Sequence, residues 1–228
     1  MHMKYIGMPA GMWLLFGASF EKQLSETLHF DVDDVKEITR RAKKKYRNII
    51  KNLPEFEKGD RFKMNIVNAS MLAAFYLNMP KKPSVAQMTD YYAAAMMIKP
   101  MIWFCEQSGK KKFTESDIEG NKKAEALRAA DHNPYSWNMK FYPYPDGSGY
   151  EARFDRCGIC TLMKELGIFE IVPAMCSMDY TMAAAGKASD FVRQYTLASG
   201  GPYCDCGYKK KQLAGIKNQD NFGDILKK

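Results

Sequence analysis

The sequence predicts an α+β protein in which a helical N-terminal half packs on a four-stranded antiparallel sheet that carries two helices. Two observations support this prediction. Apolar residues up to Pro134 recur with helical spacing, whereas aromatic runs, turn residues and glycine-bounded stretches alternate after Pro134. This second segment has the order strand-strand-helix-helix-strand-strand, which an antiparallel sheet with helices on one face accommodates.

The N-terminal helices are predicted from apolar spacing and from residues that begin or end helices. The first carries one apolar stripe in which Met12, Phe16, Phe20, Leu24 and Leu28 recur at every fourth position. A later helix begins at Ser84, which forms a capping-box pattern with Gln87. Further helices are expected over Val35–Leu53, Asp60–Asn78, Ser84 to a break at Pro100, Met101–Glu106 and Thr114–Asp131, with a turn at Ser108–Lys112.

The elements after Pro134 form the sheet and its two helices. Strands are expected over Trp137–Tyr144, Tyr150–Arg156, Phe191–Ala198 and Tyr203–Tyr208, and helices over Gly158–Leu166 and Glu170–Ala185. The Asp146-Gly147 pair is typical of a tight hairpin between the first two strands. We expect one continuous domain with a helical part (1–134), an α+β part (135–210) and a polar, lysine-rich tail (211–228).

The positive charge of the chain does not require a nucleic-acid partner. The formal net charge of the chain is +8, but its lysines are scattered or lie in short helical runs. Small anionic substrates explain this charge, so nucleic acid is not favoured as a partner. No apolar stretch approaches the ~18 residues that span a bilayer, so no membrane partner is expected. We expect a cytoplasmic protein with reduced thiols, and nothing in the sequence predicts an oligomeric state.

Five of the six cysteines lie between Cys157 and Cys206, together with Asp179. Cys157 stands just before a predicted helix, where free N–H groups and the helix dipole stabilise a thiolate. Cys176 and Asp179 are three residues apart on a predicted helix and share a face, while Cys204 and Cys206 share a face of the last predicted strand. We therefore expect Cys157, Cys176, Asp179 and Cys204 to converge on one pocket beside the sheet.

The cysteine cluster has several possible uses. A divalent metal, zinc or manganese, would be bound by Cys157, Cys176, Asp179 and Cys204, with Cys160 and Cys206 as further candidate ligands. One cysteine could instead be a nucleophile that needs no metal. Cys157-Gly-Ile-Cys160 also has the spacing of a redox dithiol, although the strand order does not fit a thioredoxin fold. Finally, the thiols could be packed or paired without chemistry.

Four motifs link the cluster to a known family. They are Cys157 with Leu166-Gly167, Met175-Cys176-x-x-Asp179-Tyr180, Phe191-Val-Arg193, and Gly200-Gly201-x-x-Cys204-Asp205. With these motifs the chain resembles the L-2-amino-thiazoline-4-carboxylic acid hydrolase family. The resemblance implies a bacterial, cytoplasmic hydrolase that opens a cyclic amidine to N-carbamoyl-L-cysteine with a divalent metal. Two positions depart from the family pattern: Gly158 replaces a proline, and Cys206 replaces an aromatic residue, which favours a metal-binding or redox variant.

The resemblance and the residues together suggest roles. Catalytic candidates are Asp179, as the base that activates water, and Cys157, Cys176 and Cys204, whose bound metal would stabilise the departing sulfur. Arg193 and Tyr180 are candidates for substrate binding, with Arg193 pairing the substrate carboxylate or, alternatively, a neighbouring strand residue. The alternative function is a non-enzymatic small-molecule or metal/redox sensor of the 4-vinyl reductase type, which has a similar order of elements.

Overall fold

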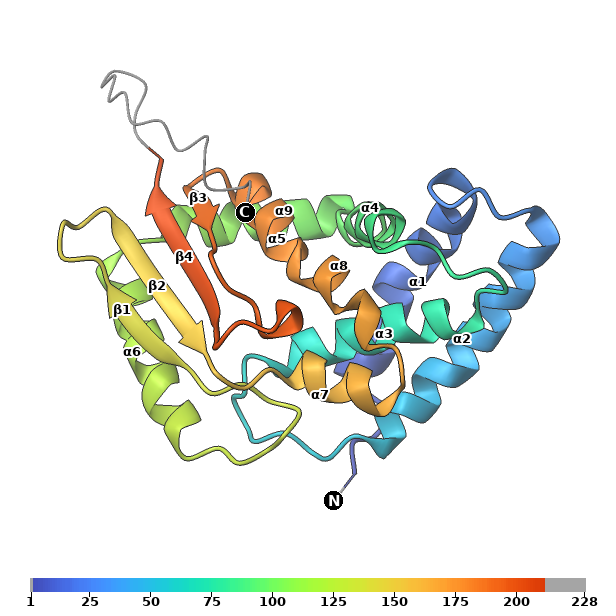
Figure 1. The fold of residues 1–228 in the computed structure, drawn as a ribbon, viewed down its shortest axis with the longest axis horizontal. Coiled ribbons are helices and arrows are strands. Elements are labelled where there is room, and N and C mark those ends of the chain that lie inside the picture. The colour runs from blue at the N-terminus through green and yellow to red at the C-terminus, as the bar shows by residue number, and fades with distance from the viewer. Residues whose placement is uncertain (1, 212–228) are drawn as a thin grey trace.

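The computed structural model describes residues 2–211 and confirms the α+β class. Its four-stranded sheet lies at one end of the molecule and α1 and α2 lie at the other, with α3, α7 and α8 between them (Figure 1). The helices are α1 (Met8–Glu26), α2 (Val32–Asn52), α3 (Lys63–Asn78), α4 (Val85–Met96), α5 (Lys99–Lys111), α6 (Glu115–Ala129), α7 (Gly158–Glu165), α8 (Val172–Cys176) and α9 (Met178–Gly186). The strands are β1 (Lys140–Pro143), β2 (Gly149–Phe154), β3 (Ser189–Val192) and β4 (Cys204–Lys210). The predicted tail, apart from Lys211, lies outside the described residues.

The helical core forms where the apolar stripes of α1, α3 and α4 meet. Trp13 stacks on Phe75 at 5.7 Å between ring centroids, and Phe20 meets the edge of Tyr91 at the same distance. The Tyr91 hydroxyl is buried but donates a hydrogen bond to the carbonyl of Phe20, 3.0 Å away. This hydrogen bond offsets the cost of burying the hydroxyl and links α4 to α1.

The helix boundaries follow the local signals in the sequence. The capping box at Ser84 and Gln87 forms as predicted. Pro100 lies in the first turn of α5, so the break between α4 and α5 is confirmed. The same helix continues to Lys111, where the sequence had indicated a turn, and Lys112 caps its end.

The sheet has the order β1-β2-β4-β3, and every neighbouring pair is antiparallel. The last strand is therefore central, with Phe154 opposite Cys204 and Ala152 opposite Cys206. Glycine is required at position 149, where β2 pairs with β4, because a Cβ atom on Gly149 would lie 1.9 Å from the Tyr208 carbonyl oxygen. This close pairing brings the cysteines of β4 beside the buried face of β2.

The prediction of a strand over Phe191–Ala198 is wrong beyond Val192. The backbone N–H groups of Gln194 and Tyr195 donate to the Asp205 carboxylate, at 2.7 and 2.6 Å, instead of to a neighbouring strand. A carboxylate that accepts backbone hydrogen bonds competes directly with sheet formation. The chain therefore turns away from the sheet after β3.

The single helix predicted over Glu170–Ala185 is also wrong, because a 3₁₀ turn, α8 and α9 replace it. The break between α8 and α9 falls at Ser177, whose hydroxyl donates to the carbonyl of Pro173 at 3.1 Å. A serine that bonds back to the residue four positions earlier commonly bends a helix.

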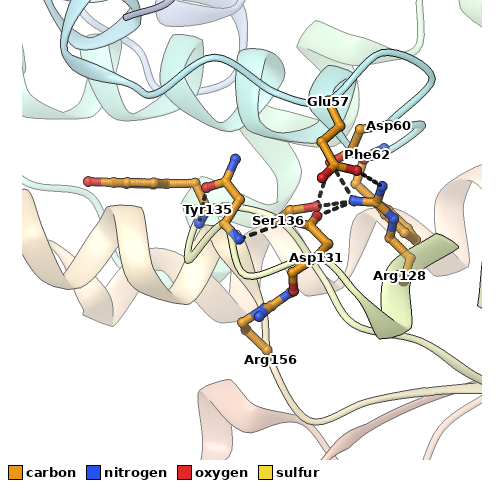
Figure 2. A network of polar contacts seen from close by, with 9 residues as sticks. Glu57, Asp60, Phe62, Arg128, Asp131, Tyr135, Ser136 and Arg156 are labelled. Atoms are coloured by element: carbon orange, nitrogen blue, oxygen red, sulfur yellow. Dashed lines mark hydrogen bonds and ion pairs between the residues drawn. The ribbon is translucent and has the colours of Figure 1, made fainter. Parts of the chain in front are cut away.

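A buried ion cluster ties the helical half to the chain that enters the sheet (Figure 2). The Arg128 guanidinium, on α6, pairs with Asp60 at 2.8 Å and with Asp131, and it contacts Glu57 at 3.5 Å. Ser136 donates to Asp60 at 2.6 Å. The side chains of Arg128, Asp60 and Asp131 are at most 5% exposed. Each charge therefore depends on its partners, since water cannot replace them.

We expect the substitution Arg128→Met to lower the free energy of unfolding by about 3–5 kcal/mol, because it leaves two buried carboxylates without a cation. Urea unfolding followed by circular dichroism measures this loss. The matched control is Arg40→Met, which removes an exposed ion pair on α2 and should shift the midpoint far less. Equal shifts in both variants would show that the cluster does not hold the two parts together.

Candidate active site

A cavity of about 410 Å³ lies between the sheet and helices α3 to α9. Besides Arg193 and Cys206, it is lined by the four side chains that were expected to converge: Cys157, Cys176, Asp179 and Cys204. They arrive from the end of β2, from α8, from α9 and from the start of β4. Residues far apart in the chain thus face one space, which is large enough for a small-molecule ligand.

Cys157 is the N-cap of α7 and lies at one end of the thiol cluster. A hydrogen bond from the Cys160 thiol lowers the pKa of Cys157, and the backbone N–H groups of Ile159 and Cys160 and the Trp137 side chain act in the same direction. Burial opposes these effects, but the resulting shift of the pKa is downward. Cys157 is therefore the thiol of this cluster best suited to be a nucleophile at neutral pH.

Gly158 explains one departure from the family pattern. A Cβ atom on Gly158 would lie 1.9 Å from the carbonyl oxygen of Tyr135. Neither proline nor any other side chain fits this position without moving the backbone. The close approach of the 135–137 segment also brings Trp137 against Cys157.

The other cavity thiols have raised pKa values. Burial raises the pKa of Cys176 to about 12, and nearby Cys157, Cys204 and Asp179 add to the shift against the opposing Arg193. Burial also raises the pKa of Cys204, and again Cys157 and Asp179 contribute. Both thiols line the cavity together with Cys157 and Asp179, and both are protonated at neutral pH.

Asp179 and Arg193 form an ion pair in the cavity wall, with 2.6 Å between Oδ2 and Nη2. Burial raises the pKa of Asp179, while Arg193 and Lys112 partly offset this shift. The Asp179 side chain is 39% exposed, and since it lines the cavity, this exposure is compatible with access for a substrate or water. A carboxylate with a raised pKa is a better proton acceptor near neutral pH than an ordinary one.

Arg193 is occupied by the protein itself. Besides Asp179, its guanidinium donates to the Cys206 sulfur at 2.9 Å and to the carbonyls of Cys176 and Asp205 at 2.9 and 3.0 Å. Four of its five N–H donors are thus used. Burial alone would lower the pKa of Arg193, but Cys206 and Asp179 raise it, so the cation is permanent. Its role in binding a substrate carboxylate stays a prediction.

Two further residues named from the sequence lie apart from the cavity wall. Cys160 is buried behind Cys157, and the pKa of its thiol is raised by the hydrogen bond to Cys157 and by burial. Tyr180 is 46% exposed and meets the edge of Phe191 at 4.7 Å. Neither residue contributes a cavity-lining surface, and the substrate-binding role of Tyr180 stays a prediction.

The residues around the cavity do not fit a metal ion. Within residues 2–211, no group of three or more histidine, cysteine, aspartate or glutamate side chains is arranged to hold one. All six cysteines are free. The carboxylate of the expected donor set is held by Arg193, and two of its thiols have raised pKa values. A divalent metal would have to displace Arg193 from Asp179 and the protons from Cys176 and Cys204.

Two cations in the cavity wall were missed in the sequence. Lys112 comes from the end of α5, and Arg61 from the loop before α3. Burial lowers the pKa of Lys112 to about 8, although Asp117 and Asp179 oppose the shift. In the sequence Lys112 belongs to a lysine run in an apparent turn, and no local pattern marks Arg61.

Fold and cavity together define an α+β protein whose thiol-lined pocket has the features of a small-molecule active site. The sequence model of the L-2-amino-thiazoline-4-carboxylic acid hydrolase family matches residues 64–208, well over half of the chain. The chain belongs to this family. No curated protein and no solved structure matches it significantly. In the part of the chain that the structure covers, no helix has the length and apolarity to cross a membrane.

We expect iodoacetamide at pH 7 to alkylate Cys157 faster than the other thiols, because a lowered pKa gives a larger thiolate fraction. Peptide mapping after a short exposure identifies the labelled site. Cys160→Ala removes the hydrogen bond to Cys157, so the pH dependence of the Cys157 alkylation rate should move to higher pH. The matched change Cys105→Ala on α5 should leave this pH dependence unchanged. Uniform labelling, or an unchanged profile in Cys160→Ala, would contradict this account.

Proposed function

We propose that the protein hydrolyses a small carboxylated cyclic amidine, as in the ring opening of L-2-amino-thiazoline-4-carboxylate to N-carbamoyl-L-cysteine. The observation that carries this proposal is the pairing, in one cavity, of a thiol whose pKa is lowered with a carboxylate whose pKa is raised. Such a pair provides a nucleophile and a base near neutral pH. Membership of the hydrolase family supports the same reaction class.

In the first step, the Cys157 thiolate attacks the amidine carbon of the ring. The carbon–sulfur bond of the ring then breaks, and the ring sulfur leaves with the electron pair and takes up a proton. Cys176 and Cys204, both protonated and both in the cavity wall, donate hydrogen bonds to the departing sulfur. The substrate carbon remains bound to the Cys157 sulfur as an isothiourea.

In the second step, a water molecule attacks this carbon and Asp179 accepts its proton. The bond to the Cys157 sulfur breaks, which restores the thiolate and releases a urea, N-carbamoyl-L-cysteine in the case of the thiazoline. One water is consumed in the whole cycle. Arg193 acts as a positioning residue here, because its bond to Asp179 holds the carboxylate toward the cavity.

The decisive experiment incubates the purified protein with L-2-amino-thiazoline-4-carboxylate and follows N-carbamoyl-L-cysteine. We expect turnover by the wild type and a loss of at least about a thousandfold in kcat for Cys157→Ser. Cys105→Ser, outside the thiol cluster, is the matched control and should keep full activity. Absence of turnover by folded wild-type protein, with and without added divalent metal, would remove this function.

Asp179→Asn should lower kcat by about 10²–10⁴-fold, because it removes the proton acceptor of the water step. The control is Asp190→Asn, which changes an exposed aspartate on β3. Circular dichroism checks that both variants are folded. Equal activity of Asp179→Asn and the control would show that Asp179 is not the base.

A further inference from the structure

We propose that Lys112 and Arg61 form an anion subsite in the cavity, which binds the carboxylate of an amphiphilic substrate whose apolar part faces the methionine and aromatic wall. This inference rests on the proposed function, since it names the substrate class of the same cavity. It also assigns carboxylate recognition to two residues other than Arg193.

The Lys112 ammonium is the first component of the subsite. It lies 3.3 Å from the ring centroid of Tyr208 and 5.4 Å from that of Tyr150. These cation–π contacts stabilise the positive charge without neutralising it. Among residues 2–211, Lys112 has no carboxylate within ion-pair distance, and its side chain lines the cavity. A half-buried ammonium without a hydrogen-bond partner can still accommodate an anion.

The Arg61 guanidinium is the second component. Its Nη2 donates to the Asn121 side-chain oxygen at 3.1 Å and contacts the Met139 sulfur at 3.2 Å. Its Nε and Nη1 groups have no partner in the described part of the chain. Arg61 is close enough to Lys112 to lower the pKa of that lysine, and both line the same cavity. Two cations that repel each other across a cavity are stabilised by an anion placed between them.

Two nearby carboxylates attract these cations but form an ion pair with neither of them in the described part of the chain. Asp117 accepts hydrogen bonds from the Tyr150 hydroxyl and from the backbone N–H of Phe113, both at 2.8 Å. Asp179 is paired with Arg193. Neither carboxylate bridges to Lys112 or Arg61 in the described structure, so the two cations face the open cavity.

The other residues of the cavity wall indicate what the apolar part of the ligand contacts. Side chains that line it include Phe62, Met96, Met101, Phe154, Met175 and Met178. A carboxylated five-membered ring alone fills only a fraction of about 410 Å³. Methionine side chains adapt to varied apolar shapes. A carboxylate that bears an apolar substituent therefore matches both ends of the cavity.

Calorimetric titration tests the subsite without requiring turnover. The probes are N-carbamoyl-L-cysteine and benzoate, each compared with its carboxamide. We expect the wild type to bind both carboxylates at least about tenfold more tightly than the amides. Lys112→Met and Arg61→Met should each reduce this preference about tenfold and leave amide affinity unchanged. Lys112→Arg should retain the preference, and Lys111→Met, on an exposed neighbour, is the matched control.

Urea midpoints establish that each variant is folded, and Lys112→Gln replaces Lys112→Met if the latter is not. A carboxylate preference that survives in both the Lys112 and Arg61 variants would overturn the subsite, as would equal binding of acid and amide by the wild type. Thiazoline turnover is measured in parallel. Carboxylate preference without turnover would overturn the proposed reaction alone, and turnover without the preference would overturn the subsite alone.

Discussion

The buried Arg193 guanidinium is the interaction on which the rest of the site depends. Its side chain is 7% exposed, so its charge must be compensated by protein groups. These groups come from the end of α8 through the Cys176 carbonyl, from α9 through Asp179, and from β4 through the Asp205 carbonyl and the Cys206 sulfur. One cation thus fixes two helices against the central strand. The thiols and the carboxylate face a common cavity because this clamp holds their elements in place.

The six thiols of the chain show how position alone separates chemical roles. Cys157 stands at the start of α7, where hydrogen bonds lower its pKa, while burial raises the pKa values of Cys176 and Cys204. Gly158 makes this difference possible, since only glycine lets the chain approach Tyr135 so closely at the start of the helix. The proposed nucleophilic role of Cys157 rests on this difference between its pKa and the pKa values of Cys176 and Cys204.

Much of the fold could be predicted because helical spacing and turn residues are local signals. The order of the four strands was visible in the sequence for this reason, whereas Cys176 and Asp179 reach one cavity from two separate helices, α8 and α9, and not from one continuous helix. The third strand was predicted to continue past Val192, where it ends, because Asp205, ten or eleven positions away, accepts hydrogen bonds from the N–H groups of Gln194 and Tyr195. Lys112 and Arg61 could not be predicted as cavity residues, because only the tertiary fold turns a helix end and a loop toward the same space.

The central claim is that Cys157 carries the substrate carbon during turnover. The most direct measurement is the intact mass of the Asp179→Asn variant, quenched after mixing with excess L-2-amino-thiazoline-4-carboxylate, followed by peptide mapping. Slow hydrolysis in this variant should let an adduct with the mass of the substrate accumulate on Cys157, approaching one per chain. Unmodified protein that nevertheless forms N-carbamoyl-L-cysteine would contradict the account, because water would then attack the ring directly.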